Sequence, residues 1–290
     1  MTLILDGKAT AAAIRSELAA QVAELSARHG RPPGLAVILV GEDPASQVYV
    51  RNKEKDCAEV GIVSFPHRLD AGISQAALEG LIQNLNADPA VDGILVQLPL
   101  PKGLNKQAVL DLIDPAKDAD GFHPMNVGRL ALGLPCFAPC TPAGVVELLR
   151  RHGIVTRGMR AVVIGRSNIV GRPMSILLSG YGAQADATVT VVHTKTPQDQ
   201  IPGICRQADL LVAAAGVPRY VQADWVKEGA VVVDVGMHRM EDGKLCGDCD
   251  YVAMRDKTAA ITPVPGGVGP MTRAMLLVNT MQAYRAHVGA

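Results

Sequence analysis

The sequence predicts an α/β protein of two domains, each built on a parallel sheet that helices cover. Short apolar runs, typical of strands buried on both faces, alternate with segments of helical periodicity. The chain has 290 residues, of which 48% are hydrophobic and 19% charged. It is therefore long enough for two domains with buried cores, and disorder and coiled coil are poor alternatives.

The first half of the chain predicts alternating helices and strands. Gly30 and Gly61 each follow a segment of helical periodicity, where glycine commonly ends a helix. The expected helices are Thr10–His29, Pro44–Val60 and one that Ser74 caps. The expected strands are Leu35–Val40, Ile62–Leu69 and Val91–Gln97. This βαβ order favours a parallel sheet.

The second half begins after a segment rich in Gly and Pro. Residues from Lys117 to Pro139 show no periodicity, so we expect a loop there and a domain boundary at its end. Thr141 followed by Pro142 predicts a helix start with a capping hydroxyl. Further strands, a hairpin with an Asp-Gly turn and a last helix are expected at Ala161–Ile164, Thr188–Val192, Leu210–Ala214, Ala230–Val233, Met240–Lys244 and Met271–His287.

Charge and composition exclude several classes of protein. Lys+Arg and Asp+Glu both count 28 and basic residues form no stripe, which argues against a nucleic-acid partner. No apolar run reaches the roughly 18 residues of a membrane span, and Met1–Asp6 carries no secretory signal. Six scattered cysteines fit a reducing compartment better than a disulfide framework. We therefore expect a cytoplasmic protein without a membrane partner.

The second domain carries a dinucleotide-binding pattern. The strand Ala161–Ile164 runs into Gly165-Arg-Ser-Asn-Ile-Val-Gly171 and then a helix. Small residues at such a junction let the backbone approach a pyrophosphate at the helix N-terminus, as in a Rossmann-like domain. The pattern is a variant, and glycines at strand–helix junctions also serve packing alone.

The residues after the next strand favour NADP over NAD. NAD-binding folds usually place an acidic residue there for the ribose hydroxyl. The sequence has Thr194 and Lys195 instead, which together with Arg166 could meet a 2′-phosphate. The alternative is that Arg166 and Lys195 are solvated surface cations.

The first domain carries the reactive groups. Ser46, Tyr49 and Lys53 lie three and four residues apart and share one helix face. A lysine beside an aromatic ring and shielded from water can act as an acid or a base. Gln97 ends a buried strand, where open sheets bind ligands, and Asp120 lies in the loop. Taken singly, a tyrosine and a lysine on such a helix are more often a surface pair, a glutamine at this place can simply cap a loop, and most such aspartates are turn residues.

Two cysteine pairs raise the question of a metal or redox site. Cys136 and Cys140, with Cys246 and Cys249, could supply thiolates to zinc, and the second pair could also form a redox couple. The two pairs fall in different predicted domains, and no histidines stand at a supporting spacing. We therefore expect no metal.

Several motifs occur in a fixed order, and two are highly specific: Gln97-Leu-Pro-Leu-Pro101 and Ile261-Thr-Pro-Val-Pro-Gly-Gly-Val-Gly-Pro-Met-Thr272. The others are Asp6–Lys8, Val40–Ser46, Tyr49–Lys53, Lys117–Phe122, Pro139–Pro142, Gly165–Pro173 and Asp234–Gly236. As a set, they resemble the bifunctional methylenetetrahydrofolate dehydrogenase/methenyltetrahydrofolate cyclohydrolase family over nearly the whole chain.

The resemblance implies two reactions of one-carbon metabolism. Oxidation of 5,10-methylenetetrahydrofolate with NADP gives the methenyl form, and hydrolysis of that form gives 10-formyltetrahydrofolate. It implies that Lys53 is catalytic, mainly in the hydrolysis, with Tyr49, Gln97 and Asp120 beside it. The implied folate contacts are Ser46, Tyr49, Lys53, Val96, Gln97, Leu98, Asp120, Pro265, Gly266, Gly267, Val268 and Gly269. The implied cofactor contacts are Thr141, Gly165, Arg166, Ser167, Thr194 and Met237.

The resemblance also implies an architecture: two α/β domains around a cleft, the second Rossmann-like. Residues 1–140 would form the folate-binding catalytic domain, joined by the C-terminal helix 271–290, and residues 141–270 the NADP-binding domain. A homodimer through the second domain is implied as well. Two features depart from the family pattern: the segment Leu178–Ala187 is slightly longer, and Met237 stands where Ile is more common.

Other functions stay open on the sequence alone. One is a lysine-based dehydrogenase of amino or hydroxy acids. Another is a dinucleotide-sensing module without turnover, although the set Tyr49, Lys53, Gln97 and Asp120 argues against it. A third is an enzyme that retains only one of the two activities.

Overall fold

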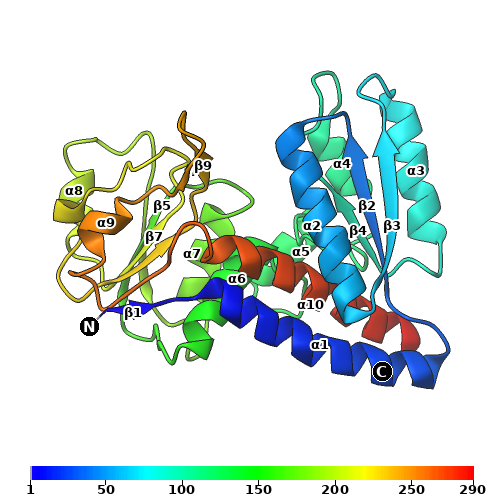
Figure 1. Cartoon of the computed structure of the whole chain (residues 1–290), viewed down its shortest axis with the longest axis horizontal. Helices are drawn as coiled ribbons and strands as arrows, with labels where there is room; N and C mark the ends of the chain where they lie inside the picture. The colour runs from blue at the N-terminus through cyan, green and yellow to red at the C-terminus, as the bar shows by residue number, and fades with distance from the viewer. Residues whose placement is uncertain (1) are drawn as a thin grey trace. The chain divides into compact units, whose positions relative to one another are not determined.

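The structure is a computed structural model that describes residues 2–290, which form two compact units. We name each unit by its main sheet. The three-stranded unit contains residues 12–129, 135–138 and 273–290, and the six-stranded unit contains residues 2–11, 130–134 and 139–272. Helices and parallel strands alternate along the chain, as the sequence predicts for an α/β protein (Figure 1).

The three-stranded unit has a parallel sheet in the order β3-β2-β4. The central strand is buried along its whole length, as its continuous apolar run predicts. Helices α3 and α4 pack apolar residues against one face of the sheet, and α2 lies on the other face (Figure 1). These elements are β2 (Gly34–Val40), β3 (Val63–Leu69), β4 (Gly93–Val96), α2 (Pro44–Val60), α3 (Gln75–Ala87) and α4 (Lys106–Leu112).

Helix α2 begins and ends where the sequence predicts. The Asp43 carboxylate accepts a hydrogen bond from the Ser46 amide at 2.7 Å and so caps the start of the helix. Gly61 ends it with a φ of 84°, a left-handed conformation that favours glycine. The predicted Ser74 cap of α3 is also confirmed, since its side chain accepts a hydrogen bond from an amide of the first turn.

Two predictions about the middle of the chain are wrong. The segment Lys117–Pro139, expected to be a loop, contains helix α5 (Pro124–Ala131). This helix is short and contains a glycine, so it gives little periodic signal. Helix α6 (Cys140–Arg151) follows, and the Thr141 hydroxyl does not cap it. That hydroxyl is instead hydrogen-bonded to the Thr272 hydroxyl at 2.9 Å.

The six-stranded unit has a wholly parallel sheet in the order β1-β11-β8-β7-β5-β6. The four predicted strands are present within one residue of their expected bounds. The strands are β1 (Leu3–Ile4), β5 (Arg160–Ile164), β6 (Thr188–Val192), β7 (Leu210–Ala213), β8 (Val231–Asp234) and β11 (Ala260–Ile261). The helices after α6 are α7 (Gly171–Ser179), α8 (Ile201–Cys205), the 3₁₀ helix η1 (Ala223–Trp225) and α9 (Tyr251–Met254).

The predicted hairpin with the Asp-Gly turn is confirmed. Strand β9 (His238–Arg239) pairs antiparallel with β10 (Leu245–Cys246). The Met240 amide donates to the Lys244 carbonyl across the turn, and Gly243 has a φ of 80°. The hairpin therefore closes as the dipeptide indicates.

The chain start departs from the predicted division, which placed residues 1–140 in one domain. Strand β1 pairs with β11, with Leu3 opposite Ala260, and so extends the sheet of the six-stranded unit. Helix α1 (Gly7–His29) then leads into the three-stranded unit, and helix α10 (Val268–Val288) continues there from the six-stranded unit. A strand of two residues gives no periodic signal, so its partner could not be predicted.

None of the six cysteines forms a disulfide. Cys57, Cys205 and Cys249 are buried, and burial raises the pKa of each thiol, to about 12 for Cys57 and to about 11 for Cys205. Cys136 and Cys246 are half-buried. Among residues 2–290, no three His, Cys, Asp or Glu side chains are grouped so as to hold a metal ion.

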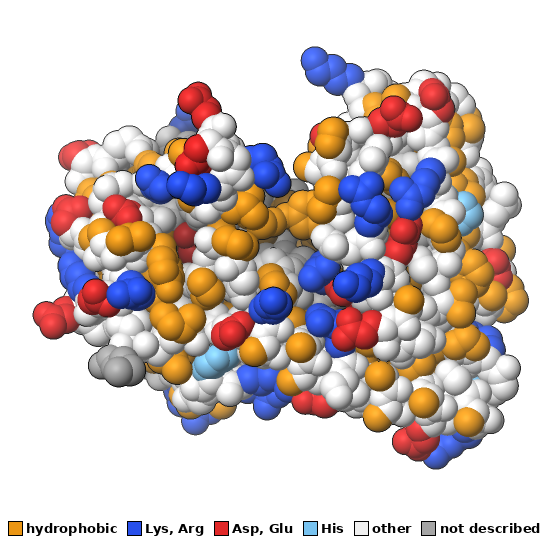
Figure 2. All heavy atoms as spheres, viewed as in Figure 1, with side chains coloured by type: hydrophobic (Ala, Val, Ile, Leu, Met, Phe, Trp, Pro, Cys, Tyr) orange, Lys and Arg blue, Asp and Glu red, His pale blue; other side chains and the backbone are white. Residues whose placement is uncertain are grey.

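Acidic and basic side chains are interspersed over the face drawn in Figure 2. This mixing agrees with the equal counts of 28 Lys+Arg and 28 Asp+Glu. In the part of the chain that the structure describes, no helix combines the length and the apolar character needed to cross a membrane.

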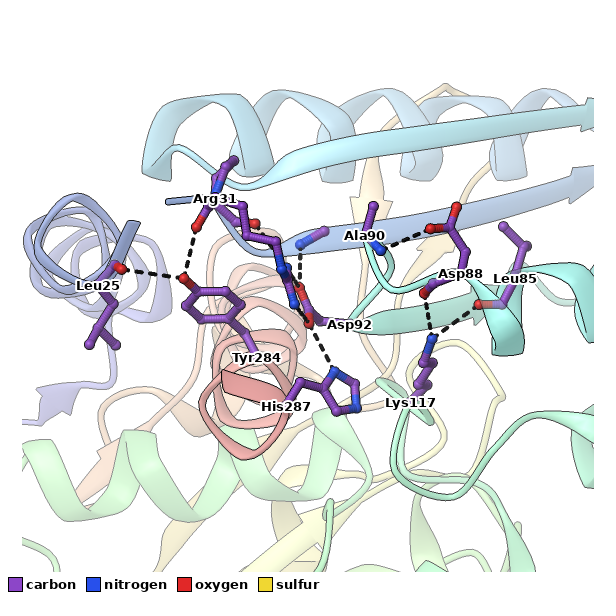
Figure 3. Close-up of polar contacts among 11 residues, drawn as sticks. Leu25, Arg31, Leu85, Asp88, Ala90, Asp92, Lys117, Tyr284 and His287 are labelled. Atoms are coloured by element: carbon purple, nitrogen blue, oxygen red, sulfur yellow. Dashed lines mark hydrogen bonds and ion pairs between the residues drawn. The ribbon is translucent and has the colours of Figure 1, made fainter. Parts of the chain in front are cut away.

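A buried polar network ties helix α10 to the three-stranded sheet (Figure 3). Asp92 lies directly before β4 and is fully buried. Arg31 donates two hydrogen bonds of 2.7 Å to its carboxylate, the Gly34 amide donates one of 2.8 Å, and His287 of α10 lies 2.9 Å from it. The Tyr284 hydroxyl donates to the Arg31 carbonyl at 2.8 Å. The network therefore joins the starts of β2 and β4 to the end of the chain.

We expect Asp92→Ala to lower the free energy of unfolding by about 3 kcal/mol or more, because it leaves the Arg31 guanidinium without its carboxylate. Urea unfolding followed by circular dichroism measures this. Glu24→Ala is the matched control: it removes an exposed pair with Arg28, which is worth about 0.5 kcal/mol or less. Equal effects of the two variants would contradict this role of Asp92.

Candidate active site

Lys53 and Gln97 form the centre of a polar site in the three-stranded unit. Lys53 projects from α2, is half-buried, and its Nζ donates to Oε1 of Gln97 at 3.0 Å. Gln97 directly follows β4, where its amide donates to the Ile38 carbonyl at 2.8 Å and its Nε2 to the Leu98 carbonyl at 2.7 Å. Gln97 is thus held by its backbone and its side chain, and it orients the lysine amine.

Asp120 joins this site because the segment before it extends the sheet. The Ile94 amide of β4 donates to the Lys117 carbonyl at 2.7 Å, and the Ala119 amide to the Ile94 carbonyl at 3.4 Å. Asp118 therefore stands opposite Ile94 in a parallel bridge. Since both segments run the same way, Asp120 reaches the carboxyl edge of the sheet together with Gln97.

The Asp120 carboxyl has an altered proton affinity. Burial raises its pKa to about 6; the nearby positive charge of Lys53 opposes this shift, and the charge of Asp118 adds to it. An acid that titrates near neutral pH next to a half-buried lysine is typical of a functional site.

Two further residues, which the sequence analysis missed, hold the Asp120 loop. Asp118 is buried, and its carboxylate accepts hydrogen bonds from the amides of Phe122 and His123 and from Nδ2 of Asn126 at 2.9 Å. Lys117 is 7% exposed, and its Nζ donates to the Leu85 and Asp88 carbonyls at the end of α3 (Figure 3). Burial lowers the pKa of Lys117. Charged residues in an irregular loop were the available signal; the partners of Lys117 are distant in sequence, whereas those of Asp118 lie within the next eight residues.

The other predicted residues of this unit differ in how accessible they are. Tyr49 is 37% exposed, and burial of its ring raises the pKa of its hydroxyl, with Arg273 opposing the shift. Ser46 is only 4% exposed. Val96 packs its side chain into the core with α3 and α4, so only its backbone is available to a ligand. Leu98 is half-exposed.

Arg273 of α10 reinforces the same face of α2. It pairs with Asp56 at 3.3 Å, and Asp56 lies one turn beyond Lys53 on the helix. Burial raises the pKa of Asp56, while Arg273 and then Arg15 oppose the shift. This pair could not be predicted from the sequence, because Arg273 and Asp56 are far apart in the chain.

The loop after β5 has the backbone shape that the dinucleotide pattern predicts. A Cβ on Gly165 would overlap the Ala214 carbonyl, and Gly165 has a φ of 109°. A Cβ on Gly171 would overlap the Gly165 carbonyl. The Ser167 hydroxyl accepts a hydrogen bond from the Val170 amide at 3.1 Å. The loop therefore curves tightly at the start of α7, and these close backbone contacts require its glycines.

The three residues that are candidates for contact with a 2′-phosphate lie at one edge of the six-stranded sheet. Arg166 follows β5 and Thr194 and Lys195 follow β6; these strands are parallel neighbours, so their carboxyl ends meet at the same edge. All three side chains are exposed.

The remaining predicted residues belong to the same unit. Met237 is 40% exposed and lies near Gly269. Gly266 has a φ of 109°, and a Cβ on Gly267 would lie 2.6 Å from the Pro263 carbonyl oxygen. The segment Pro265–Gly269, after β11, is thus a tight turn into α10 that needs its glycines.

Comparison with known proteins finds the same two-part organisation. Residues 5–120 match the family model of the tetrahydrofolate dehydrogenase/cyclohydrolase catalytic domain. Residues 139–288 match that of the tetrahydrofolate dehydrogenase/cyclohydrolase NAD(P)-binding domain. The chain belongs to the tetrahydrofolate dehydrogenase/cyclohydrolase family.

Relatives of this family resemble the chain along its whole length. The bifunctional protein FolD of Maridesulfovibrio salexigens is 61% identical over 287 residues, which cover 99% of each chain. The crystal structure of the FolD dehydrogenase/cyclohydrolase of Campylobacter jejuni has a TM-score of 0.95 at 50% identity and 99% coverage of both chains. The Trypanosoma brucei enzyme, crystallised with NADP and an inhibitor, has a TM-score of 0.94 at 44% identity and covers 100% of this chain and 99% of that one.

Membership of the tetrahydrofolate dehydrogenase/cyclohydrolase family decides between the functions that the sequence left open. The chain is a bifunctional enzyme with a dehydrogenase and a cyclohydrolase activity. The fold class, two α/β units of which the second is Rossmann-like, is confirmed.

We expect Asp120→Asn to stabilise the protein near neutral pH while lowering activity. Because burial raises the pKa of Asp120 to about 6, its ionisation disfavours the folded state. The effect is absent below about pH 4, where folded and unfolded chains both hold the proton, and is full above about pH 6. Urea unfolding should show a gain of about 1 to 2 kcal/mol at pH 7.5, and none at pH 3.8. A loss of stability at pH 7.5 would contradict this assignment.

Proposed function

We propose that the Lys53, Gln97 and Asp120 cluster carries the chemistry of both reactions of this enzyme. The enzyme oxidises 5,10-methylenetetrahydrofolate with NADP and hydrolyses the methenyl product to 10-formyltetrahydrofolate. The observation that supports the cluster is the 3.0 Å hydrogen bond that aims the Lys53 amine, with a titratable carboxyl beside it.

The hydrolysis is the step that needs a protein group. Water adds to the methenyl carbon and loses a proton, which gives a neutral carbinolamine. The hydroxyl proton then leaves as the formyl C=O forms, and one carbon–nitrogen bond breaks as its nitrogen takes up a proton, so that one proton is released overall. A group that receives and returns a proton must therefore lie close to the carbon. Lys53 is suited to this role because Gln97 fixes its Nζ and the residue is half-buried.

Recognition of the folate would use the other residues of the cluster. The Tyr49 ring offers an exposed apolar face for a planar ring. Asp120 offers a carboxyl that can donate or accept a hydrogen bond near neutral pH. Ser46, Val96 and Leu98 would contribute contacts from α2 and from the end of β4. The loop Pro265–Gly269 would contribute backbone contacts.

NADP, when bound, accepts the hydride, and the protein supplies binding and orientation. The residues after β5 fit such a group, since Gly165 and Gly171 let the loop curve tightly at the start of α7, where Rossmann-like domains bind a pyrophosphate. Ser167, Thr141 and Met237 would contact the dinucleotide. Arg166 would meet the 2′-phosphate, with Thr194 beside it, and no acidic residue follows β6 directly to repel that phosphate.

We further propose that the chain forms a homodimer through the six-stranded unit and works in the cytoplasm. Strand β6 ends the sheet order, and its Thr188 and Thr190 are exposed, so it offers a backbone edge to a second copy. Six cysteines that form no disulfide suit a reducing compartment. Sedimentation velocity and cell fractionation would test the two proposals.

We expect Lys53→Met to lower the cyclohydrolase rate by about a hundredfold or more, because it removes the acid–base group. Purified enzyme is mixed with 5,10-methylenetetrahydrofolate and NADP, and NADPH and methenyl-folate are followed together by absorbance. In the wild type, NADPH forms without build-up of methenyl-folate; in the variant, any methenyl-folate that forms accumulates.

Lys55→Met provides the control for this variant, because Lys55 is exposed on the same helix. It should behave as the wild type. If Lys53→Met hydrolysed methenyl-folate at the wild-type rate, the role of Lys53 would be refuted. If the wild type reduced neither NADP nor NAD, the assignment of a dehydrogenase function would be refuted.

We expect Arg166→Ala to raise the KM for NADP about tenfold or more and to leave the KM for NAD unchanged, since a charge-assisted hydrogen bond is lost only with the phosphorylated cofactor. Initial rates with each cofactor measure this. Arg157→Ala is the control, because Arg157 is an exposed arginine that precedes β5 at the opposite edge of the sheet. A parallel change for both cofactors would rule out contact with the 2′-phosphate.

A further inference from the structure

Two buried carboxylates lie at the carboxyl edge of the six-stranded sheet, outside the residues assigned so far. Asp234 ends β8 and is 2% exposed; Asp248 follows β10 and is 0% exposed. Burial raises the pKa of Asp234 to about 6. Buried carboxylates are costly unless hydrogen bonds satisfy them, so their partners show what they hold in place.

Asp234 holds the backbone that follows the hairpin. Its Oδ1 accepts hydrogen bonds from the Gly236 and Asp248 amides at 2.9 Å, and its Oδ2 accepts one from the Cys249 amide at 2.8 Å. A Cβ on Gly247 would overlap the Asp234 carboxylate. The end of β8 and the chain after β10 are thus locked together through backbone amides.

The side chain of Asp248 then reaches two other segments. Its Oδ2 accepts a hydrogen bond from the Gly216 amide at 2.9 Å. Its Oδ1 lies 2.7 Å from Nε2 of His238, which donates because a carboxylate only accepts. A Cβ on Gly236 would overlap the Asp248 carboxylate. One carboxylate therefore joins the loop after β7 to the first strand of the hairpin.

Both segments continue into the proposed cofactor edge. Gly216 lies two residues after Ala214, and the Ala214 carbonyl packs so closely against Gly165 that no side chain fits there. His238 directly follows Met237, a proposed cofactor contact that is 40% exposed. The hydrogen bonds of Asp248 thus set the spacing between the Gly165 loop and Met237.

The bond between Asp248 and His238 links the hairpin to the loop after β7. The Gly216 amide satisfies Oδ2 of the carboxylate, and His238 is the partner of Oδ1. His238 is half-buried and lies on the two-residue strand β9, which pairs with the equally short β10. This bond therefore holds the start of the hairpin directly after Met237.

We propose that His238 and Asp248 are positioning residues for the dinucleotide, holding Met237 and the loops after β5 and β7 at the spacing that the bound cofactor needs. This inference rests on the proposed cofactor site of the six-stranded unit. It assigns no contact with the reacting atoms to either residue.

The test compares His238→Ala and His238→Gln in the full-length enzyme. His238→Ala should raise the dissociation constant of NADP, measured by isothermal titration calorimetry, about fivefold or more, and the KM for NADP in parallel. The KM for the folate and the cyclohydrolase rate on methenyl-folate without cofactor should stay within about twofold of the wild type. The glutamine amide can replace the imidazole donor, so His238→Gln should restore NADP binding.

Lys244→Ala is the matched control, since Lys244 lies on the same hairpin and its side chain is 84% exposed. It should leave both cofactor and folate parameters unchanged. A second variant, Asp248→Asn, should weaken NADP binding in the same way as His238→Ala.

The inference is overturned if folded His238→Ala binds NADP with wild-type affinity. It is also overturned if cofactor binding, the KM for folate and the cyclohydrolase rate all worsen together, because that pattern indicates a general loss of structure. Failure of the wild type to bind or reduce NADP would instead contradict the proposed cofactor site, so the two failures are distinguishable.

Discussion

The backbone pairing of Lys117–Ala119 with Ile94 is the interaction on which the proposed catalytic cluster depends. It adds a strand-like segment to the three-stranded sheet and brings Asp120 to the edge where Gln97 ends β4. Lys53 comes to the same edge from α2, whose start and end are fixed by Asp43 and Gly61. The cluster is therefore assembled from a helix, a strand end and a loop; hydrogen bonds of the backbone place these segments, and the bond between Lys53 and Gln97 then orients the amine.

Three of the carboxylates described above, those of Asp92, Asp234 and Asp120, show that removal from solvent has different consequences in different places. Asp92 is paired with a guanidinium and accepts a backbone amide, so it joins elements of the fold. Asp234 and Asp120 have raised pKa values because burial dominates over their favourable partners. Asp234 offsets this cost with three amide hydrogen bonds, whereas Asp120 keeps a reactive carboxyl at the site. A residue such as Asp120 lowers the stability of the fold and in return offers a titratable group at the proposed site.

Elements whose signals are local could be predicted, and those that depend on distant partners could not. The bounds of α2, the buried run of β2 and the Asp-Gly hairpin follow from capping, burial and turn chemistry within a few residues. The pairing of β1 with β11 and the bond between Thr141 and Thr272 join residues far apart in sequence. In the site, helical spacing alone placed Tyr49 and Lys53 together. Asp120 was assigned only by family resemblance. The roles of Lys117 and Asp248 emerged from hydrogen bonds to distant segments, and the role of Asp118 from hydrogen bonds within its own loop.

The buried thiols provide each unit with its own chemical reporter. Only a thiolate reacts readily with alkylating reagents, and burial raises the pKa of Cys57, Cys205 and Cys249 and screens them from solvent. These sulfurs therefore become reactive when the surrounding structure opens. Cys57 lies in the three-stranded unit, and Cys205 and Cys249 lie in the six-stranded unit. The alkylation rate of each thiol consequently measures local opening in the unit that contains it, without any introduced label.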